Sequence, residues 1–449
     1  MRMIWINAPR GDPAQTDPMT PTRQSALAPW PPHSGPDAVF VGFPDPARFS
    51  PELGESQFRS AARHSNEDPM PRLLSLHLRL PFDGNTADCP VAPGADRGRS
   101  HASFYRLARE CELVAPLFDR DRDVVQLQLD GLAGKTASDG LGELLHAVSR
   151  HFFLSHASTR EFLIVLPDGV YDARELAGLV DLGFNRVRFR ALPAAADRDA
   201  TAVLERSLVA AREAGMRSTA LDLGGPPGSD ADFEAGLQQL LALRADRIHL
   251  CCPGGPASLA TAVPLADRAW HHADAVSALL AAGYEALGLD LFVLPQDDLA
   301  RARQSGLLHH NALGYVPQAQ TDLVGLGVGA RSRIGDACFE NCPDLTAWES
   351  SIDMGELPVW RGLQLDADER LRSDLLQALL CAGSIDLVQM QEQHGIVFAE
   401  YFRDELDTLK PLREAGLLHY NLENLQLGSQ GRLALQAICA PFAVVRRRP

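Results

Sequence analysis

The chain has 449 residues, of which 45% are hydrophobic and 22% are charged, a composition typical of a folded globular protein with two or three domains. Its 58 acidic and 42 basic residues give a formal net charge of −16, which argues against nucleic acid as a partner. No apolar run of about eighteen residues occurs, and the N-terminus lacks a signal-peptide core, so we expect no membrane partner and a cytoplasmic location.

Residues 1–70 are expected to form an N-terminal arm that leads into the folded part of the chain. Residues 8–37 are rich in Pro, Ser and Thr and include the sequence Trp30-Pro31-Pro32. This stretch shows no apolar periodicity, which predicts irregular backbone rather than a helix or a strand.

Residues 71–298 alternate between short apolar runs and longer segments with helical periodicity. The runs occupy residues 73–80, 124–129, 162–166, 186–191, 219–223, 247–251 and 286–293. The helical segments include residues 172–183, 201–215, 232–244 and 272–283. Strands that alternate with helices predict a parallel α/β sheet, with functional loops at the carboxyl ends of the strands.

Residues 299–449 have a different pattern, which predicts a separate, mostly helical C-terminal domain. Glycines punctuate residues 321–335, and helical periodicity then covers residues 366–381 and 397–416. The short run of residues 417–427 predicts a hairpin, and a last helix is expected after Gly431.

A phosphate-binding loop is one alternative for the sequence DGLAGKT, residues 130–136, which follows an expected strand. The full motif needs a glycine five positions before Gly134, and that position is Leu129. Without this glycine the backbone amides cannot wrap a phosphate, so the sequence disfavours a nucleotide site there.

The eight cysteines show no CxxC spacing, which favours reduced thiols over a disulfide framework. They form two close groups, Cys251-Cys252 at the end of an expected strand and Cys338 with Cys342. Buried structural thiols are the favoured interpretation of both groups, although either could supply replacement metal ligands.

Nine short segments carry a resemblance to a known protein family. They read LLSLHLRLPF (73–82), GFNRVRF (183–189), GYEALGLDLF (283–292), LLHHNALGY (307–315), TDLVGLGVGARSRIGD (321–336), WRGLQL (360–365), FAEYF (398–402), LREAGLL (412–418) and GRLALQAIC (431–439). In order and spacing they resemble the oxygen-independent coproporphyrinogen III oxidases, which are radical S-adenosylmethionine (SAM) enzymes of haem biosynthesis. The resemblance covers roughly residues 50–445.

The resemblance implies an α/β fold, a partial (β/α)6-type parallel barrel of the radical SAM type over residues 71–298, with a mostly helical C-terminal domain over residues 299–449. In the family, three cysteines of a CxxxCxxC loop ligate a [4Fe-4S] cluster, and SAM binds its open iron. Here the three ligand positions carry Asp83, Ala87 and Pro90, and Cys89 is the one thiol nearby. Because one thiolate cannot hold a cubane, we expect no metal and no cofactor.

Other functional positions of the family have changed as well. The tyrosine that begins the cluster strand corresponds to His77, and the glycine run near the SAM amino-acid group begins here at Asp130. Asp222 matches an aspartate of the SAM pocket, and Arg198 aligns with the pocket arginine. Asp222 and Arg198 are therefore candidate remnants of a SAM site, and we expect no catalytic residue.

Three interpretations of the function remain open. The first is a non-catalytic member that binds a porphyrin or haem, with His77, Arg79 and Arg190 as candidate ligand-binding residues and Arg188 as a further cation. The second is a regulatory or scaffolding partner of a haem-pathway protein. The third is a genuine oxidase that uses replacement ligands, so whether the chain is an enzyme stays open. The ligand count disfavours the third, and we rank the first slightly ahead of the second.

Overall fold

The structure, a computed structural model, describes residues 40, 42–70, 72–81, 97–132, 138–167, 169–189, 198–224, 230–251, 265–318 and 320–445. The cluster-ligand positions Asp83, Ala87 and Pro90 lie outside these ranges, as do Cys89 and Arg190. Arg198 begins a helix, but its side chain is not among those described.

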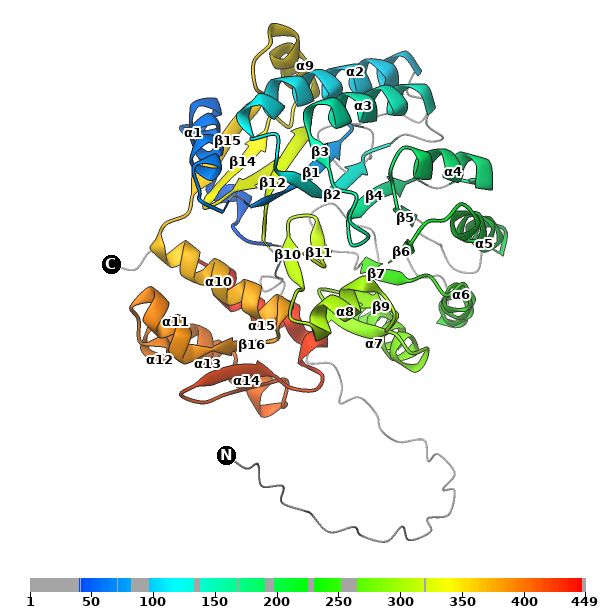
Figure 1. The fold of residues 1–449 in the computed structure, drawn as a ribbon. Helices are drawn as coiled ribbons and strands as arrows, with labels where there is room; N and C mark the ends of the chain where they lie inside the picture. Colours follow the sequence, from blue (N-terminus) through cyan, green and yellow to red (C-terminus); the bar gives the residue numbers. More distant parts are fainter. Residues whose placement is uncertain are drawn as a thin grey trace, which may run out of the picture.

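A parallel sheet flanked by helices forms the centre of the molecule (Figure 1). Its strands are β1 (Leu73–Arg79), β2 (Asp123–Asp130), β4 (Glu161–Leu166), β5 (Arg186–Phe189), β6 (Ser218–Gly224) and β7 (Arg247–Cys251), paired in parallel in that order. The helices on its outer face are α2 (Arg97–Val114), α3 (Ser138–His151), α4 (Ala173–Asp181), α5 (Arg198–Glu213), α6 (Asp230–Ala242) and α7 (Leu265–Ala281). The predicted α/β fold with a partial parallel barrel is confirmed.

The strands present an apolar face to the helices and a polar face to the barrel interior. In β1 the leucines Leu74, Leu76 and Leu78 are fully buried in the core that includes residues of α2 and α3. Because strand side chains alternate between faces, Ser75 and His77 lie on the opposite face. This alternation brings polar side chains together inside the barrel.

The sheet continues past residue 299 into the part of the chain that we expected to be mostly helical. Strand β12 (Thr321–Gly327) lies parallel beside β1, and β13 (Arg331–Ile334), β14 (Ala337–Asn341) and β15 (Val359–Gln364) follow it antiparallel. The glycines of this segment permit close packing, since a Cβ atom on Gly327 would lie 1.9 Å from the carbonyl oxygen of Arg79. The domain boundary at residue 299 stays a prediction, but the sheet crosses it.

The last apolar run of the barrel region, residues 286–293, forms two strands rather than the single strand that we expected. Strands β8 (Glu285–Gly288) and β9 (Leu291–Val293) pair antiparallel, and β9 also pairs antiparallel with β7. Leu289 and Asp290 make the reversal with φ values of 50° and 60°. Aspartate tolerates a left-handed backbone, but leucine seldom adopts one, and Leu289 lies within an apolar run that favours a continuous strand.

The C-terminal residues pack around a second apolar core, which includes Leu375, Leu379 and Phe402. The segment expected as one helix over residues 397–416 is three short helices, while the helix expected over residues 366–381 and the hairpin expected over residues 417–427 are present. The elements are α8 (Asp298–Gln304), β10 (His309–Asn311), β11 (Gly314–Val316), α10 (Ala367–Cys381), β16 (Ser384–Asp386), α11 (Leu387–His394), α12 (Phe398–Tyr401), α13 (Arg403–Thr408), α14 (Lys410–Glu414), β17 (Leu418–Tyr420), β18 (Asn424–Leu427) and α15 (Leu435–Ala443).

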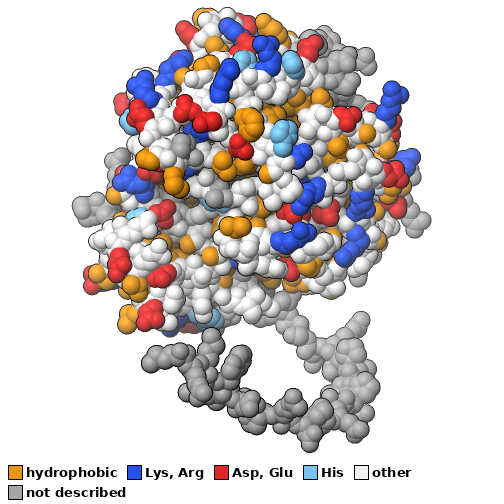
Figure 2. All heavy atoms as spheres, viewed as in Figure 1, with side chains coloured by type: hydrophobic (Ala, Val, Ile, Leu, Met, Phe, Trp, Pro, Cys, Tyr) orange, Lys and Arg blue, Asp and Glu red, His pale blue; other side chains and the backbone are white. Residues whose placement is uncertain are grey.

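A few short elements complete the described structure. They are α1 (Glu55–Asn66), β3 (Phe153–Leu154), α9 (Leu345–Met354) and the 3₁₀ turns at Pro46–Arg48, Ala115–Leu117 and Gly431–Ala434. Figure 2 shows acidic and basic side chains interspersed over one face of the molecule. Within the described ranges, no helix has the length and apolar character that crossing a bilayer requires.

Candidate ligand site at the barrel mouth

A network of buried ion pairs fills the barrel where the strands begin. Arg247 Nη1 and Nη2 donate to the carboxylate of Glu161 at 3.0 and 3.1 Å, and its Nε donates to Asp297 at 2.9 Å. Arg186 lies 2.7 Å from Glu161 and 2.6 Å from Asp298. Because these charges satisfy one another at the amino ends of the strands, a ligand would be expected at the carboxyl ends.

Strand register determines which side chains share the inner face above this network. His77 lies beside Gln128, Arg79 lies beside Asp130, and Asp222 lies beside His249 on neighbouring parallel strands. Register partners in a parallel sheet point to the same side. The inner wall near the mouth is therefore polar on β1, β2, β6 and β7.

Asp130, His77 and Gln128 form a hydrogen-bonded group on β1 and β2. His77 Nε2 lies 3.0 Å from Asp130 Oδ2, and the amide of Gln128 donates to the same oxygen at 2.9 Å. Burial alone would raise the pKa of Asp130, but His77, Gln128 and the more distant Arg188 outweigh burial and hold that pKa well below its usual range. The carboxylate is therefore a fixed negative charge in the wall.

Arg188, Asp222 and His249 line the opposite part of the wall, on β5, β6 and β7. Arg188 Nε is 3.9 Å from Asp222 Oδ1, which is too long for a hydrogen bond. Burial and, next, the positive charge of Arg188 lower the pKa of His249 to about 4. His249 is therefore a neutral imidazole at physiological pH, and the group offers donors and acceptors to a ligand.

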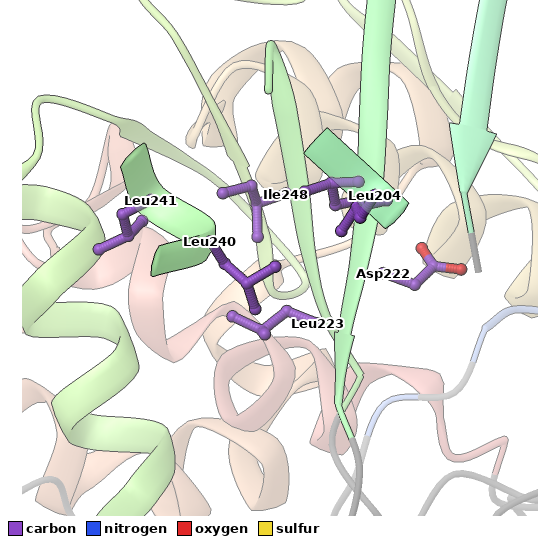
Figure 3. A pocket seen from close by; sticks show the side chains of 7 residues that line it. Leu204, Asp222, Leu223, Leu240, Leu241 and Ile248 are labelled. Atoms are coloured by element: carbon purple, nitrogen blue, oxygen red, sulfur yellow. The ribbon is translucent and has the colours of Figure 1, made fainter. Parts of the chain in front are cut away.

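A small apolar cavity near Asp222 is separate from this wall. Its lining includes Leu204 of α5, Leu240 of α6 and Ile248 of β7, so it lies between the sheet and the outer helices. Figure 3 shows the Asp222 carboxylate pointing away from Leu223 and Leu240. The cavity is a packing gap, and Asp222 faces the barrel interior, while its role as a remnant of a SAM site stays a prediction.

Of the other predicted ligand residues, the structure describes the side chain of Arg79 but not those of Arg190 and Arg198. Arg79 Nη1 donates to the carbonyl oxygen of Gly329 at 3.2 Å, which places this guanidinium at the end of β1 near the turn after β12. Arg190 and the Arg198 side chain lie outside the described residues, so their roles stay predictions. The structure thus brings together His77, Arg188 and Asp222 near the mouth.

The phosphate-loop alternative overlaps the end of β2. Gly131 has φ +77°, and a Cβ atom there would lie 1.9 Å from the carbonyl oxygen of Leu80. Close backbone approach explains this glycine without a phosphate, while Gly134 and Lys135 lie outside the described residues.

The described thiols do not gather into a site that could hold an iron–sulfur cluster. The free cysteines with described side chains are Cys111, Cys338, Cys342, Cys381 and Cys439. Burial raises the pKa of Cys338 to about 11 and that of Cys111 to about 12, which disfavours the thiolate form. Across the described residues, no group of three His, Cys, Asp or Glu side chains is placed to hold a metal ion.

Gln128 and His249 were not predicted as site residues, and the pairing of Asp130 with His77 was not predicted either. A signal for Gln128 and Asp130 was present, because β2 carries Gln126, Gln128 and Asp130 at every second position of an otherwise apolar strand. Such alternation indicates one polar face inside a barrel. His249 also alternates with buried Ile248 and Leu250.

Comparisons with known proteins identify the family, although no family model matches the chain. The oxygen-independent coproporphyrinogen III oxidase of Pseudomonas aeruginosa is 31% identical over 425 residues, which cover 90% of this chain and 92% of that protein. The proteins of the same name from Salmonella typhimurium and Escherichia coli are each 30% identical, over 93% of this chain and 94% of their own lengths.

A solved structure agrees with these relatives. It is described as "Coproporphyrinogen III oxidase (HemN) from Escherichia coli is a Radical SAM enzyme", and it matches 90% of this chain and 97% of its own with a TM-score of 0.78 and 27% identity. Sequence identity of this extent, together with the barrel described above, shows that the chain belongs to the oxygen-independent coproporphyrinogen III oxidase family of haem biosynthesis.

Proposed function

We propose that this chain is a non-catalytic member of its family that binds a tetrapyrrole at the barrel mouth. The observation that carries the proposal is the residue set at the three cluster-ligand positions, Asp83, Ala87 and Pro90. A [4Fe-4S] cluster with an open iron needs three thiolates, and alanine and proline supply no donor. Radical chemistry by the family's route needs this cluster.

The chemistry of the inner wall supports retention of an anionic ligand. His77 and Arg188 face the interior near the carboxyl ends of the strands, and Arg79 ends the first strand. Arginine pairs with carboxylates through two parallel hydrogen bonds, and a coproporphyrin carries four propionates. A barrel that lacks the redox centre and carries these basic side chains is suited to binding such a molecule without converting it.

Titration with coproporphyrin III should give saturable binding with a Kd below about 100 μM, which corresponds to roughly −5.5 kcal/mol. The readouts are the visible absorption of the porphyrin and the fluorescence of the protein, which has 5 tryptophans. A water-soluble porphyrin with cationic side chains is the matched control, because it has the same ring but no carboxylate. Equal binding of both porphyrins, or of neither, would contradict the proposal, and the second outcome would favour the alternative of a haem-pathway protein partner.

A further inference from the structure

Arg188 is a half-buried guanidinium without a hydrogen-bond partner in the described part of the chain. Its nearest recorded partner is Asp222 Oδ1, 3.9 Å from Nε, and that Nε atom is buried without an acceptor. The side chain is only 15% exposed, so water cannot fully replace the missing acceptors. A buried guanidinium N–H without an acceptor is costly in a low-dielectric wall.

Arg186, two residues earlier on the same strand, provides an internal comparison. Its side chain is 2% exposed and lies 2.7 Å from Glu161 and 2.6 Å from Asp298, so its charge is matched by two close carboxylates, although its Nε atom, like that of Arg188, has no acceptor in hydrogen-bonding geometry. Arg188 points to the same face one layer nearer the carboxyl ends of the strands, and among the described residues its recorded carboxylate contact is the longer one of 3.9 Å to Asp222. Among the described residues, Arg186 and Arg247 thus pair closely with carboxylates at the amino ends of the strands, while Arg188, nearer the carboxyl ends, makes no hydrogen bond.

The groups around Arg188 limit what can bind to it. Asp130 is held by His77 and Gln128 through Oδ2, while its Oδ1 atom is buried without a partner. Asp222 adds a second negative charge, and His249 beside it is neutral at physiological pH. These two carboxylates would repel a dianionic phosphate more strongly than a monoanionic carboxylate.

We infer that Arg188 anchors a carboxylate group of the ligand inside the barrel, with Asp130 and Asp222 as the flanking walls that select a monoanion. This inference rests on the proposed function for the identity of the whole ligand, since a propionate of a tetrapyrrole is the carboxylate expected. The binding of a carboxylate by Arg188 depends only on the residues of the barrel wall, not on the identity of the whole ligand. It can therefore be tested with propionate alone.

The first test measures coproporphyrin III binding to Arg188→Met and Arg188→Lys. Arg188→Met should weaken the Kd at least about tenfold, as expected for loss of a charge-assisted pair, and Arg188→Lys should recover part of the loss. Arg174→Met, at an exposed position on α4, is the matched control and should bind as the unchanged protein does. An unchanged Kd in Arg188→Met would overturn the anchor while leaving the proposed function in place.

The second test uses sodium propionate, with sodium chloride as control, and follows the thermal unfolding midpoint. Propionate at tens of millimolar should raise the midpoint of the unchanged protein and leave that of Arg188→Met unaltered, because ligands that bind the folded state stabilise it. A propionate response without porphyrin binding would support the anchor and contradict the proposed function. Without ligand, Arg188→Met should unfold at the same or a higher temperature, whereas a lower one would indicate a structural role and overturn the inference.

Discussion

Replacement of Arg247 by methionine is expected to lower the free energy of unfolding by about 3–5 kcal/mol, the largest effect among single substitutions in the barrel. Arg247 donates to both oxygens of Glu161 and to Asp297, and these carboxylate side chains are 6% and 2% exposed. Methionine fills much of the volume of the arginine side chain. Glu161 then keeps Arg186 as its cation, and Asp297 accepts hydrogen bonds from neutral donors only. The measurement is equilibrium unfolding in urea or guanidinium.

Arg217→Met is the matched control in the same network. Arg217 donates to Asp298 at 2.6 and 2.8 Å, but its side chain is 38% exposed, so solvent screens the pair. The expected loss is below about 1 kcal/mol. Equal losses from Arg217→Met and Arg247→Met would show that burial does not govern the stability of this network.

Glu110→Leu should lower the free energy of unfolding by at least about 3 kcal/mol, because it leaves three buried donors without an acceptor. Glu110, on α2, is 1% exposed. Its carboxylate accepts from the indole of Trp348 at 2.9 Å, from the backbone N–H of Gly327 at 2.9 Å and from the amide of Asn341 at 2.7 Å. Unfolding of Glu110→Leu and of the near-isosteric Glu110→Gln, compared at pH 5, measures this loss.

The same carboxylate gives the protein a pH-dependent stability. Burial raises the pKa of Glu110 from 4.5 to about 7, although its three hydrogen bonds oppose the shift. A folded-state pKa above the unfolded value means that Glu110 contributes most stability below pH 4.5 and loses that contribution as the pH rises through 7. The loss amounts to about 3 kcal/mol at roughly 1.4 kcal/mol per pKa unit. Unfolding free energies of Glu110→Gln should lack this decline between pH 5 and pH 8, and a parallel decline in both proteins would contradict the assignment.

The parallel barrel could be predicted from the sequence because its strands are mostly apolar on the outer face. Each run expected between residues 73 and 251 contains a strand of the sheet, and Asp172 and Asp366 cap helices close to their expected starts through capping boxes. In these segments the local sequence pattern and the tertiary structure favour the same helices and strands, so the sequence alone predicts them.

The parts that could not be predicted depend on contacts between distant segments. The residues around position 327 do not show that its glycine lies against the backbone of Arg79. This close approach allows β12 to pair with β1. Likewise, the pairing of His77 with Asp130 joins residues 53 positions apart. Arg188 could be named as a cation from the sequence, but only the folded wall shows that its Nε atom has no hydrogen-bond acceptor.

Anaerobic reconstitution with iron and sulfide tests most directly whether this chain can hold the family's cluster. We expect no bound iron above background and no broad absorption near about 400 nm. The matched variant combines Asp83→Cys, Ala87→Cys and Pro90→Cys, which restores CxxxCxxC spacing, and it should take up iron under the same conditions. About four irons per unchanged chain, lost on replacing Cys89 or Cys251 by alanine, would contradict this expectation.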